Sequence, residues 1–134
     1  MQRWILEGVR LLPPETDEDI REAFYKLGVS VQSDLVHLYS TIGGMSEMDN
    51  QYWRLWPLTE ILEWNGKSSE ILVQHGLVFA DFLLDSHHFR VKSNGNDSSV
   101  YIDGYNDKPP RLVARSLVEF FDAYVTDPDK VLDI

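Results

Sequence analysis

The chain has 134 residues, of which 43% are hydrophobic and 25% are charged, a composition normal for a soluble globular protein. This length predicts one domain with a single core, and no apolar run approaches the roughly 20 residues needed to span a bilayer. The formal net charge of −10 argues against nucleic-acid binding and against anionic membrane surfaces, because both require a basic footprint. It favours a protein partner with a basic surface, although solubility alone also explains it.

The absence of cysteine excludes disulfides and thiolate metal sites, and it fits a reducing, cytoplasmic location. Residues 1–14 are predicted to form a leader segment in which Trp4 to Leu6 packs as a short strand or turn. Glu7 and Gly8 interrupt the apolar residues there, so the N-terminus does not resemble a signal peptide.

Three helices are predicted in the first half of the chain from apolar spacing and end signals. Thr16 caps the first helix, and Gly28 ends it. Ser33 opens the second, which Gly43-Gly44 terminates. The third runs over residues 58–64, after a proline suited to a helix start.

Strands are predicted where β-branched and aromatic residues alternate with polar ones or form short apolar runs. A turn over residues 93–98 links two of them as a hairpin. The predicted strands are Tyr52 to Trp56, Leu77 to Phe79, His88 to Lys92, Val100 to Asp103 and Arg111 to Ala114.

The last helix has the clearest start signal, because Ser116 and Glu119 match a capping box. Its apolar stripe runs through Phe120 and Tyr124 and stops before Pro128. The sheet is the only large apolar surface that this stripe could cover, so Phe120 is expected to be buried. With no internal repeat and no linker, the chain is predicted to be one α+β domain over residues 1–134.

A metal site is the first chemistry to consider, since Asp81, Asp85, His87 and His88 fall within eight residues. Neighbouring histidines on a strand point to opposite faces, so both cannot readily bind one ion. His37 has no partner at a metal-ligand spacing. No metal and no cofactor is expected.

Catalytic signals are also missing from the sequence. There is no cysteine nucleophile, no G-x-S-x-G motif and no carboxylate pair in an apolar setting, and Gly43-Gly44 lacks the lysine of a phosphate-binding loop. The aromatic run Tyr52 to Trp56 could stack on bases, but the acidic balance favours a role in the core. We therefore expect no enzymatic activity.

The order of these elements resembles the SUKH superfamily, which includes the Smi/Knr-type cell-wall synthesis regulators of yeast and many bacterial proteins. The likeness extends from about Glu15 onward, and its most specific pieces are Trp56-Pro57-Leu58, Val78 to His87, and Ala114 to Phe121. Leu117 stands where the family pattern usually has Phe, and the Gly-Gly pair follows a helix without the usual Leu-Pro start.

This resemblance implies a central, mostly antiparallel sheet with helices packed around it. It also implies a function, because similar bacterial members are commonly immunity proteins that bind and neutralise a toxin, often a nuclease or deaminase with a basic surface. A regulatory interaction module like the eukaryotic relatives is the alternative, and a small-ligand binder or enzyme is the third. The oligomeric state is left open.

Five residues are predicted to form the partner-binding surface. Asp81 and Asp85 follow strand ends, while Asp103, Tyr105 and Asp107 lie in or beside the loop between the last two strands. If these edges are neighbours in space, they form one acidic rim. The alternative is that each of these residues caps a turn and faces water.

Overall fold

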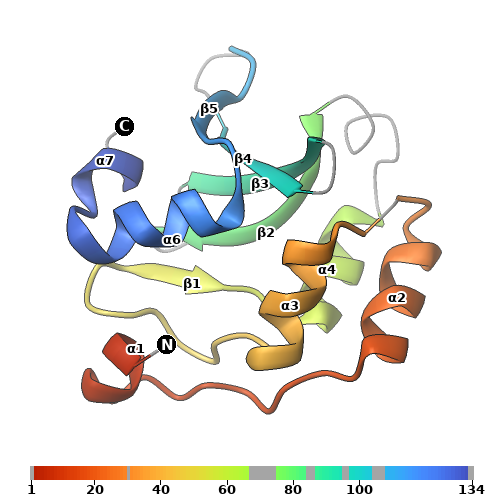
Figure 1. The fold of residues 1–134 in the computed structure, drawn as a ribbon, viewed down its shortest axis with the longest axis horizontal. Helices are drawn as coiled ribbons and strands as arrows, with labels where there is room; N and C mark the ends of the chain where they lie inside the picture. The colour runs from red at the N-terminus through yellow and green to blue at the C-terminus, as the bar shows by residue number, and fades with distance from the viewer. Residues whose placement is uncertain are drawn as a thin grey trace.

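The structure is a computed structural model that describes residues 2–29, 31–66, 75–83, 87–94, 97–103 and 108–132. Within these ranges the chain forms five strands and six helices, labelled as in Figure 1. The strands are β1 (Trp53–Leu55), β2 (Leu77–Phe82), β3 (His87–Asn94), β4 (Asp97–Ile102) and β5 (Arg111–Ala114). The helices are α1 (Gln2–Leu6), α2 (Asp17–Lys26), α3 (Ser33–Thr41), α4 (Leu58–Asn65), α6 (Leu117–Thr126) and α7 (Asp129–Leu132).

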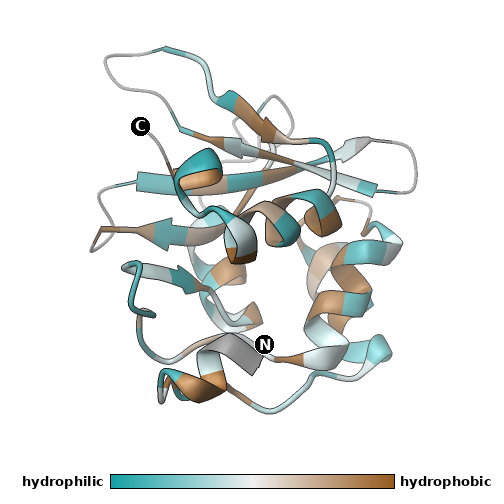
Figure 2. Cartoon of the chain, turned by 60° about the vertical axis from the view of Figure 1, so that its left-hand side comes forward, coloured by the Kyte–Doolittle hydropathy of each residue, from teal (hydrophilic) through white to brown (hydrophobic). Residues whose placement is uncertain are grey.

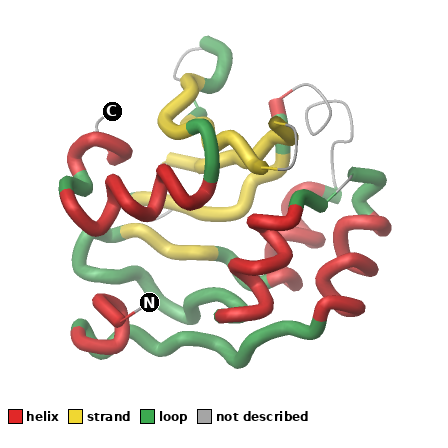
Figure 3. Tube along the Cα trace, in the orientation of Figure 1, coloured by secondary structure: helices red, strands yellow, loops and turns green. Residues whose placement is uncertain are grey.

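The strands form one sheet in the order β1-β2-β3-β4-β5, and every neighbouring pair is antiparallel (Figures 1 and 3). Each strand therefore pairs with the next strand in the sequence, and the register shifts once between β2 and β3 and once between β4 and β5. This arrangement confirms the predicted α+β fold with an antiparallel sheet.

The two predicted caps, Thr16 and Ser116, are helix starts. The Thr16 hydroxyl accepts a hydrogen bond from the backbone N–H of Asp19 at 3.1 Å, and the Ser116 hydroxyl accepts one from Glu119 at the same distance. Each bond satisfies a backbone donor that the first turn of a helix leaves without a partner. Gly28 follows α2 with φ +73, a conformation that glycine adopts at little cost.

The first face of the sheet is apolar and is covered by α6, with α3 beside it (Figure 1). Trp53 of β1 lies at the centre of this core, with the ring of Phe120 from α6 at 5.7 Å and that of Phe89 from β3 at 6.3 Å. Phe120 is fully buried, as its place in the stripe predicted. Coloured by hydropathy, the strands and helices carry both apolar and polar segments, as amphipathic elements around one core must (Figure 2).

The N-terminal segment differs from the prediction, because Gln2–Leu6 is a short helix rather than a strand or turn. Five residues are too few for helix propensity to decide. The anchor is Trp4, whose ring stacks on Trp53 at 6.0 Å and whose Nε1 donates to Asp49 at 2.8 Å. Tertiary contacts far along the chain therefore set this element.

Three strands are longer than predicted, whereas β1 is shorter, covering Trp53–Leu55 instead of Tyr52 to Trp56, and β5 has the predicted bounds. β2 continues through Phe82 instead of stopping at Phe79, and the β3–β4 hairpin stays paired as far as Asn94 and Asp97. Residues 67–74, for which the sequence left a further helical turn open, lie outside the described residues.

The loop before β1 is organised by a buried carboxylate. Asp49 accepts hydrogen bonds from the backbone N–H groups of Gln51 and Trp53 and from Trp4 Nε1, at 2.8–3.1 Å. It also accepts one from the hydroxyl of Tyr124. Burial and this carboxylate raise the pKa of Tyr124 above its ordinary value of 10.0. Asp49 thus ties α1 and α6 to the first strand.

Candidate functional site

Two of the predicted site residues lie in one row across the sheet. Asp81 of β2 pairs with His88 of β3, and the backbone N–H of Asp103 donates to the carbonyl of His88 at 2.9 Å. Residues opposite one another in a sheet share a face. Asp81, His88 and Asp103 therefore occupy the second face of the sheet, which faces away from α6.

Asp81 is only 5% exposed, although it carries a carboxylate. It accepts a hydrogen bond from Trp56 Nε1 at 2.6 Å and lies 3.4 Å from Nη2 of Arg54. Arg54 also donates to Glu60 through Nη1 at 2.8 Å, and this hydrogen bond raises the pKa of Arg54. The Asp81 carboxylate therefore has both a hydrogen-bond donor and a positively charged partner, which a carboxylate needs when it is removed from water.

Asp103 forms a second ion pair on the same face. Arg90 donates to its two carboxylate oxygens from Nε at 2.6 Å and from Nη2 at 3.3 Å. The third guanidinium nitrogen, Nη1, donates to the carbonyl of Gly76 at 2.8 Å. Because 27% of the Asp103 side chain stays exposed, this carboxylate can still meet a partner from solution.

Aromatic rings complete the face. The Trp64 ring, from α4, lies 5.1 Å from the His88 ring and 5.9 Å from the Trp56 ring, and the guanidinium of Arg90 lies 5.8 Å from its centroid. Trp64 is 39% exposed. No pattern in the sequence marks this ring or the two arginines as site residues. The alternation of β3 did place His88 and Arg90 together, opposite Phe89.

The other predicted site residues, Asp85, Tyr105 and Asp107, lie outside the described residues. The rim as a whole therefore stays a prediction. For the two residues that the structure describes, the carboxylates alternate with arginines rather than forming an unbroken acidic strip. Such a surface can recognise a partner through charge and aromatic contact.

The adjacent histidines point to opposite faces, as predicted. The His87 ring lies 6.0 Å from the Phe82 ring, while His88 lies against the tryptophans of the second face. Burial, and then the charge of His88, lowers the pKa of His87 below its ordinary value of 6.5. Among the described residues, no three His, Cys, Asp or Glu side chains are grouped as a metal site requires.

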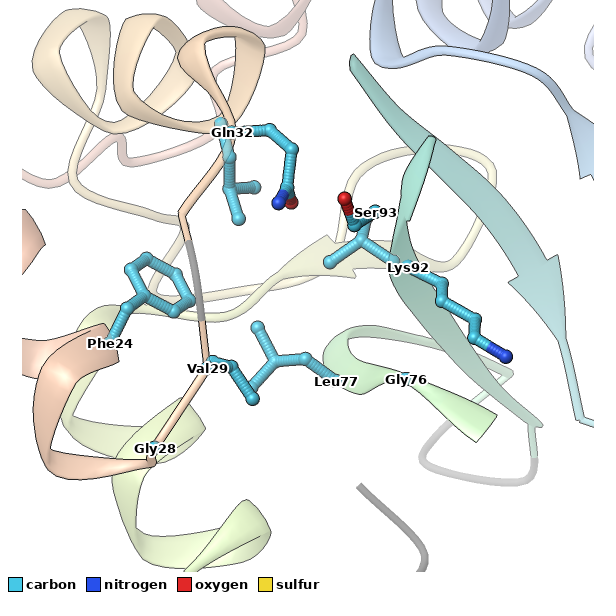
Figure 4. A pocket seen from close by; sticks show the side chains of 10 residues that line it. Phe24, Gly28, Val29, Gln32, Gly76, Leu77, Lys92 and Ser93 are labelled. Atoms are coloured by element: carbon cyan, nitrogen blue, oxygen red, sulfur yellow. The ribbon is translucent and has the colours of Figure 1, made fainter. Parts of the chain in front are cut away.

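A cavity of about 300 Å³ lies elsewhere, between the α2–α3 connection and the β2–β3 hairpin. Phe24, Val29 and Leu77 give it apolar walls, and Figure 4 shows Gln32 and Ser93 on facing sides of it. The Lys92 chain extends away from these residues in the same view. The cavity can hold a small, largely uncharged molecule.

Comparison with known protein families shows which family the chain belongs to. The model of the SMI1/KNR4 family (SUKH-1) matches residues 14–123, most of the chain. The chain belongs to this family. The match begins within a residue of the predicted Glu15 start, and it includes β1 to β5, α2 to α4, and all the described residues of the second sheet face.

Helices α1 and α7 lie outside the matched range. A search of curated proteins finds no significant match. No helix in the described part of the chain is both long and apolar enough to cross a membrane.

Proposed function

We propose that this SUKH-1 protein is an immunity protein that binds a cognate bacterial toxin and neutralises it by stoichiometric occlusion. The observation that carries the proposal is the family match over residues 14–123, since bacterial members that resemble this chain commonly have this role. The toxin is a nuclease or another domain with a basic surface. No step of the mechanism needs catalysis by the immunity protein.

The charge of the chain supports this proposal. A nuclease must hold phosphates and so presents a basic surface around its active site. A protein with a net charge of −10 is steered toward such a surface and competes with nucleic acid for it. Many of the carboxylates are accessible: those of Asp17, Glu18, Asp19 and Glu22 are exposed on α2.

The proposed interface keeps the predicted set of Asp81, Asp85, Asp103, Tyr105 and Asp107. The buried Asp81 holds Trp56 and Arg54 in place, and Asp103 offers its exposed edge to a basic side chain. Ion pairs at the rim of an interface mainly speed association, while buried aromatic anchors slow dissociation.

Co-expression tests the function directly. The product of a neighbouring toxin-like gene is expressed in bacteria with and without this chain, and growth is scored. We expect rescue, together with a one-to-one complex of the purified proteins by light scattering. Rescue without a complex, or a complex that leaves the toxin fully active, would count against occlusion.

The interface prediction is tested by reversing charge at two of its positions. We expect Asp103→Lys with Asp107→Lys to slow association with the toxin and to flatten its dependence on salt, measured by stopped-flow fluorescence at several ionic strengths. Glu18→Lys with Glu22→Lys on α2 makes the same change in net charge and serves as the control. Equal slowing by both pairs would show steering by net charge alone and remove Asp103 and Asp107 from the site.

A regulatory interaction module of the SMI1/KNR4 type is the second candidate, favoured by the name of the matching family. A small-ligand binder is the third, favoured by the cavity of about 300 Å³ beside Gln32. The co-expression experiment separates the first candidate from both, because neither alternative predicts rescue from a toxin.

A further inference from the structure

A second cavity, of about 210 Å³, opens between α1, α3 and α6. Its lining is mostly apolar and includes Trp4, Ile42, Phe121 and Val125, while His37 and Thr41 of α3 add polar atoms to it. Trp4 and Ile42 are buried, whereas Val125 at the mouth is 55% exposed. The cavity is therefore an apolar recess in the surface with its floor in the core.

The walls of this recess are held by ring contacts and hydrogen bonds. Trp4 stacks on Trp53 at 6.0 Å and meets the edge of Phe121 at 6.1 Å. The polar atoms of the two largest lining side chains, Trp4 Nε1 and the Tyr124 hydroxyl, both donate to Asp49. Because both donors point to Asp49, these two residues contribute the apolar surface of their rings to the recess. A preformed apolar site binds without a cost for ordering its walls.

The size of the recess selects its occupant. Pockets for drug-sized ligands measure roughly 300–1,000 Å³, which is larger than this one. An apolar cavity of about 150 Å³ already holds a benzene ring. The recess thus fits a single large apolar side chain, such as Phe, Leu or Met.

The charged residues near the recess indicate the charge of the segment that would carry this side chain. Between Ser116 and Leu132 the exposed charged residues are four acids and one base: Glu119, Asp122, Asp127, Asp129 and Lys130. Asp122 lies between the lining residues Phe121 and Val125 in α6. A basic segment is attracted to this helix, and an acidic one is repelled.

We propose that this recess receives an apolar anchor side chain of the basic toxin, with Lys or Arg neighbours of that side chain meeting the acids of α6. The inference rests on the proposed function and extends it to a second contact surface. Because Trp4 belongs to α1, outside the family match, the recess also gives this chain a means of telling its own toxin from those of other family members.

The test closes the mouth of the recess without changing charge. Val125→Trp covers it, and Val118→Trp is the matched control: the same substitution on α6, seven residues earlier, at a site 65% exposed that does not line the recess. We expect Val125→Trp to weaken toxin binding about tenfold or more, mainly through faster dissociation, and Val118→Trp to change it less than about threefold. Thr41→Met, which fills the recess from α3, should repeat the loss.

Equal affinities for the wild type and Val125→Trp would overturn the proposal, as would equal losses in the two Trp variants. Thermal melts confirm that the variants are folded before binding is measured.

A second arm separates this inference from the proposed function. The isotope-labelled protein is titrated with the peptide Lys-Lys-Phe-Lys-Lys, capped at both ends, and with its Lys-Lys-Ala-Lys-Lys counterpart, and NMR shifts are followed. We expect saturable shifts at Trp4, Ile42 and Val125 with the Phe peptide only, and their loss in Val125→Trp. Failure of the whole protein to bind any toxin would end the proposed function, while identical shifts with both peptides would end the recess as an anchor site.

Discussion

The two faces of the sheet bury their residues in different ways. On the first face, Phe89 and Trp53 meet Phe120 of α6, and aromatic contact and burial hold the layers together. On the second face, Arg54 pairs with Asp81 and Arg90 pairs with Asp103, and the Arg90 guanidinium lies over the Trp64 ring. Apolar contacts are non-directional and stabilise the fold in proportion to the apolar area they bury. Charged hydrogen bonds instead fix the orientation of the side chains that form them.

This difference separates stability from recognition. Burying an apolar ring contributes free energy directly, but buried ion pairs lose much of their Coulomb attraction to desolvation. Paired side chains of defined direction are costly to rearrange, and on this face they leave Asp103 and the Trp64 ring partly exposed in fixed positions. The first face therefore stabilises the core, whereas the second holds its charged side chains in a fixed arrangement, as the proposed partner-binding surface requires.

The largest expected effect comes from the first face. Phe120→Ala removes a fully buried ring and should lower the free energy of unfolding by about 3–5 kcal/mol, measured by urea denaturation. Val118→Ala on the exposed side of the same helix is the control and should change it by less than about 0.5 kcal/mol. A Phe120→Ala midpoint equal to that of the wild type would contradict the docking of α6.

A smaller effect is expected on the second face. Asp81→Ala leaves the buried Trp56 N–H without an acceptor and should cost about 1–3 kcal/mol in the same assay. Arg54 keeps Glu60, which limits the loss. Glu22→Ala breaks the exposed pair with Lys26 and is the control, with a change near zero. If both substitutions cost the same, Asp81 has no special structural role.

Sequence patterns predicted the local features of this fold. The period of two in β3 puts Phe89 and Arg90 on opposite faces, and the caps at Thr16 and Ser116 mark two helix starts. These signals succeed because they depend on neighbours a few residues away.

Features that depend on distant partners escaped prediction. The sequence predicts a strand that ends at Phe79 and places Asp81 after it, whereas the structure has Asp81 inside β2. It is tolerated inside β2 because β1, 27 residues earlier, supplies Arg54. α1 is likewise fixed by Asp49 and Trp53 rather than by its own five residues. The candidate site shares this limit, since the contact between Trp64 and His88 depends on the packing of α4 against the sheet.

The smallest expected effect is a pH dependence of the unfolding free energy, which comes from His87 on the first face. Burial and the neighbouring His88 lower the pKa of His87 in the folded protein below its ordinary value of 6.5. The unfolded chain therefore binds a proton more readily as the pH falls. The stability that neutral His87 contributes is present above about pH 6.5 and is lost below it.

Urea denaturation at about pH 7.5 and about pH 5.5 measures this loss, over a range chosen to lie above the ordinary pKa values of Asp and Glu. We expect the fall in unfolding free energy to shrink in His87→Gln, because Gln does not titrate. His37→Gln, on the exposed side of α3, should keep the wild-type difference. His87→Gln could also show the same fall in unfolding free energy between the two pH values as the wild type. That result would mean that burial of His87 contributes no measurable pH dependence, and that a charge costs no more on the first face than on the second at this end of the sheet.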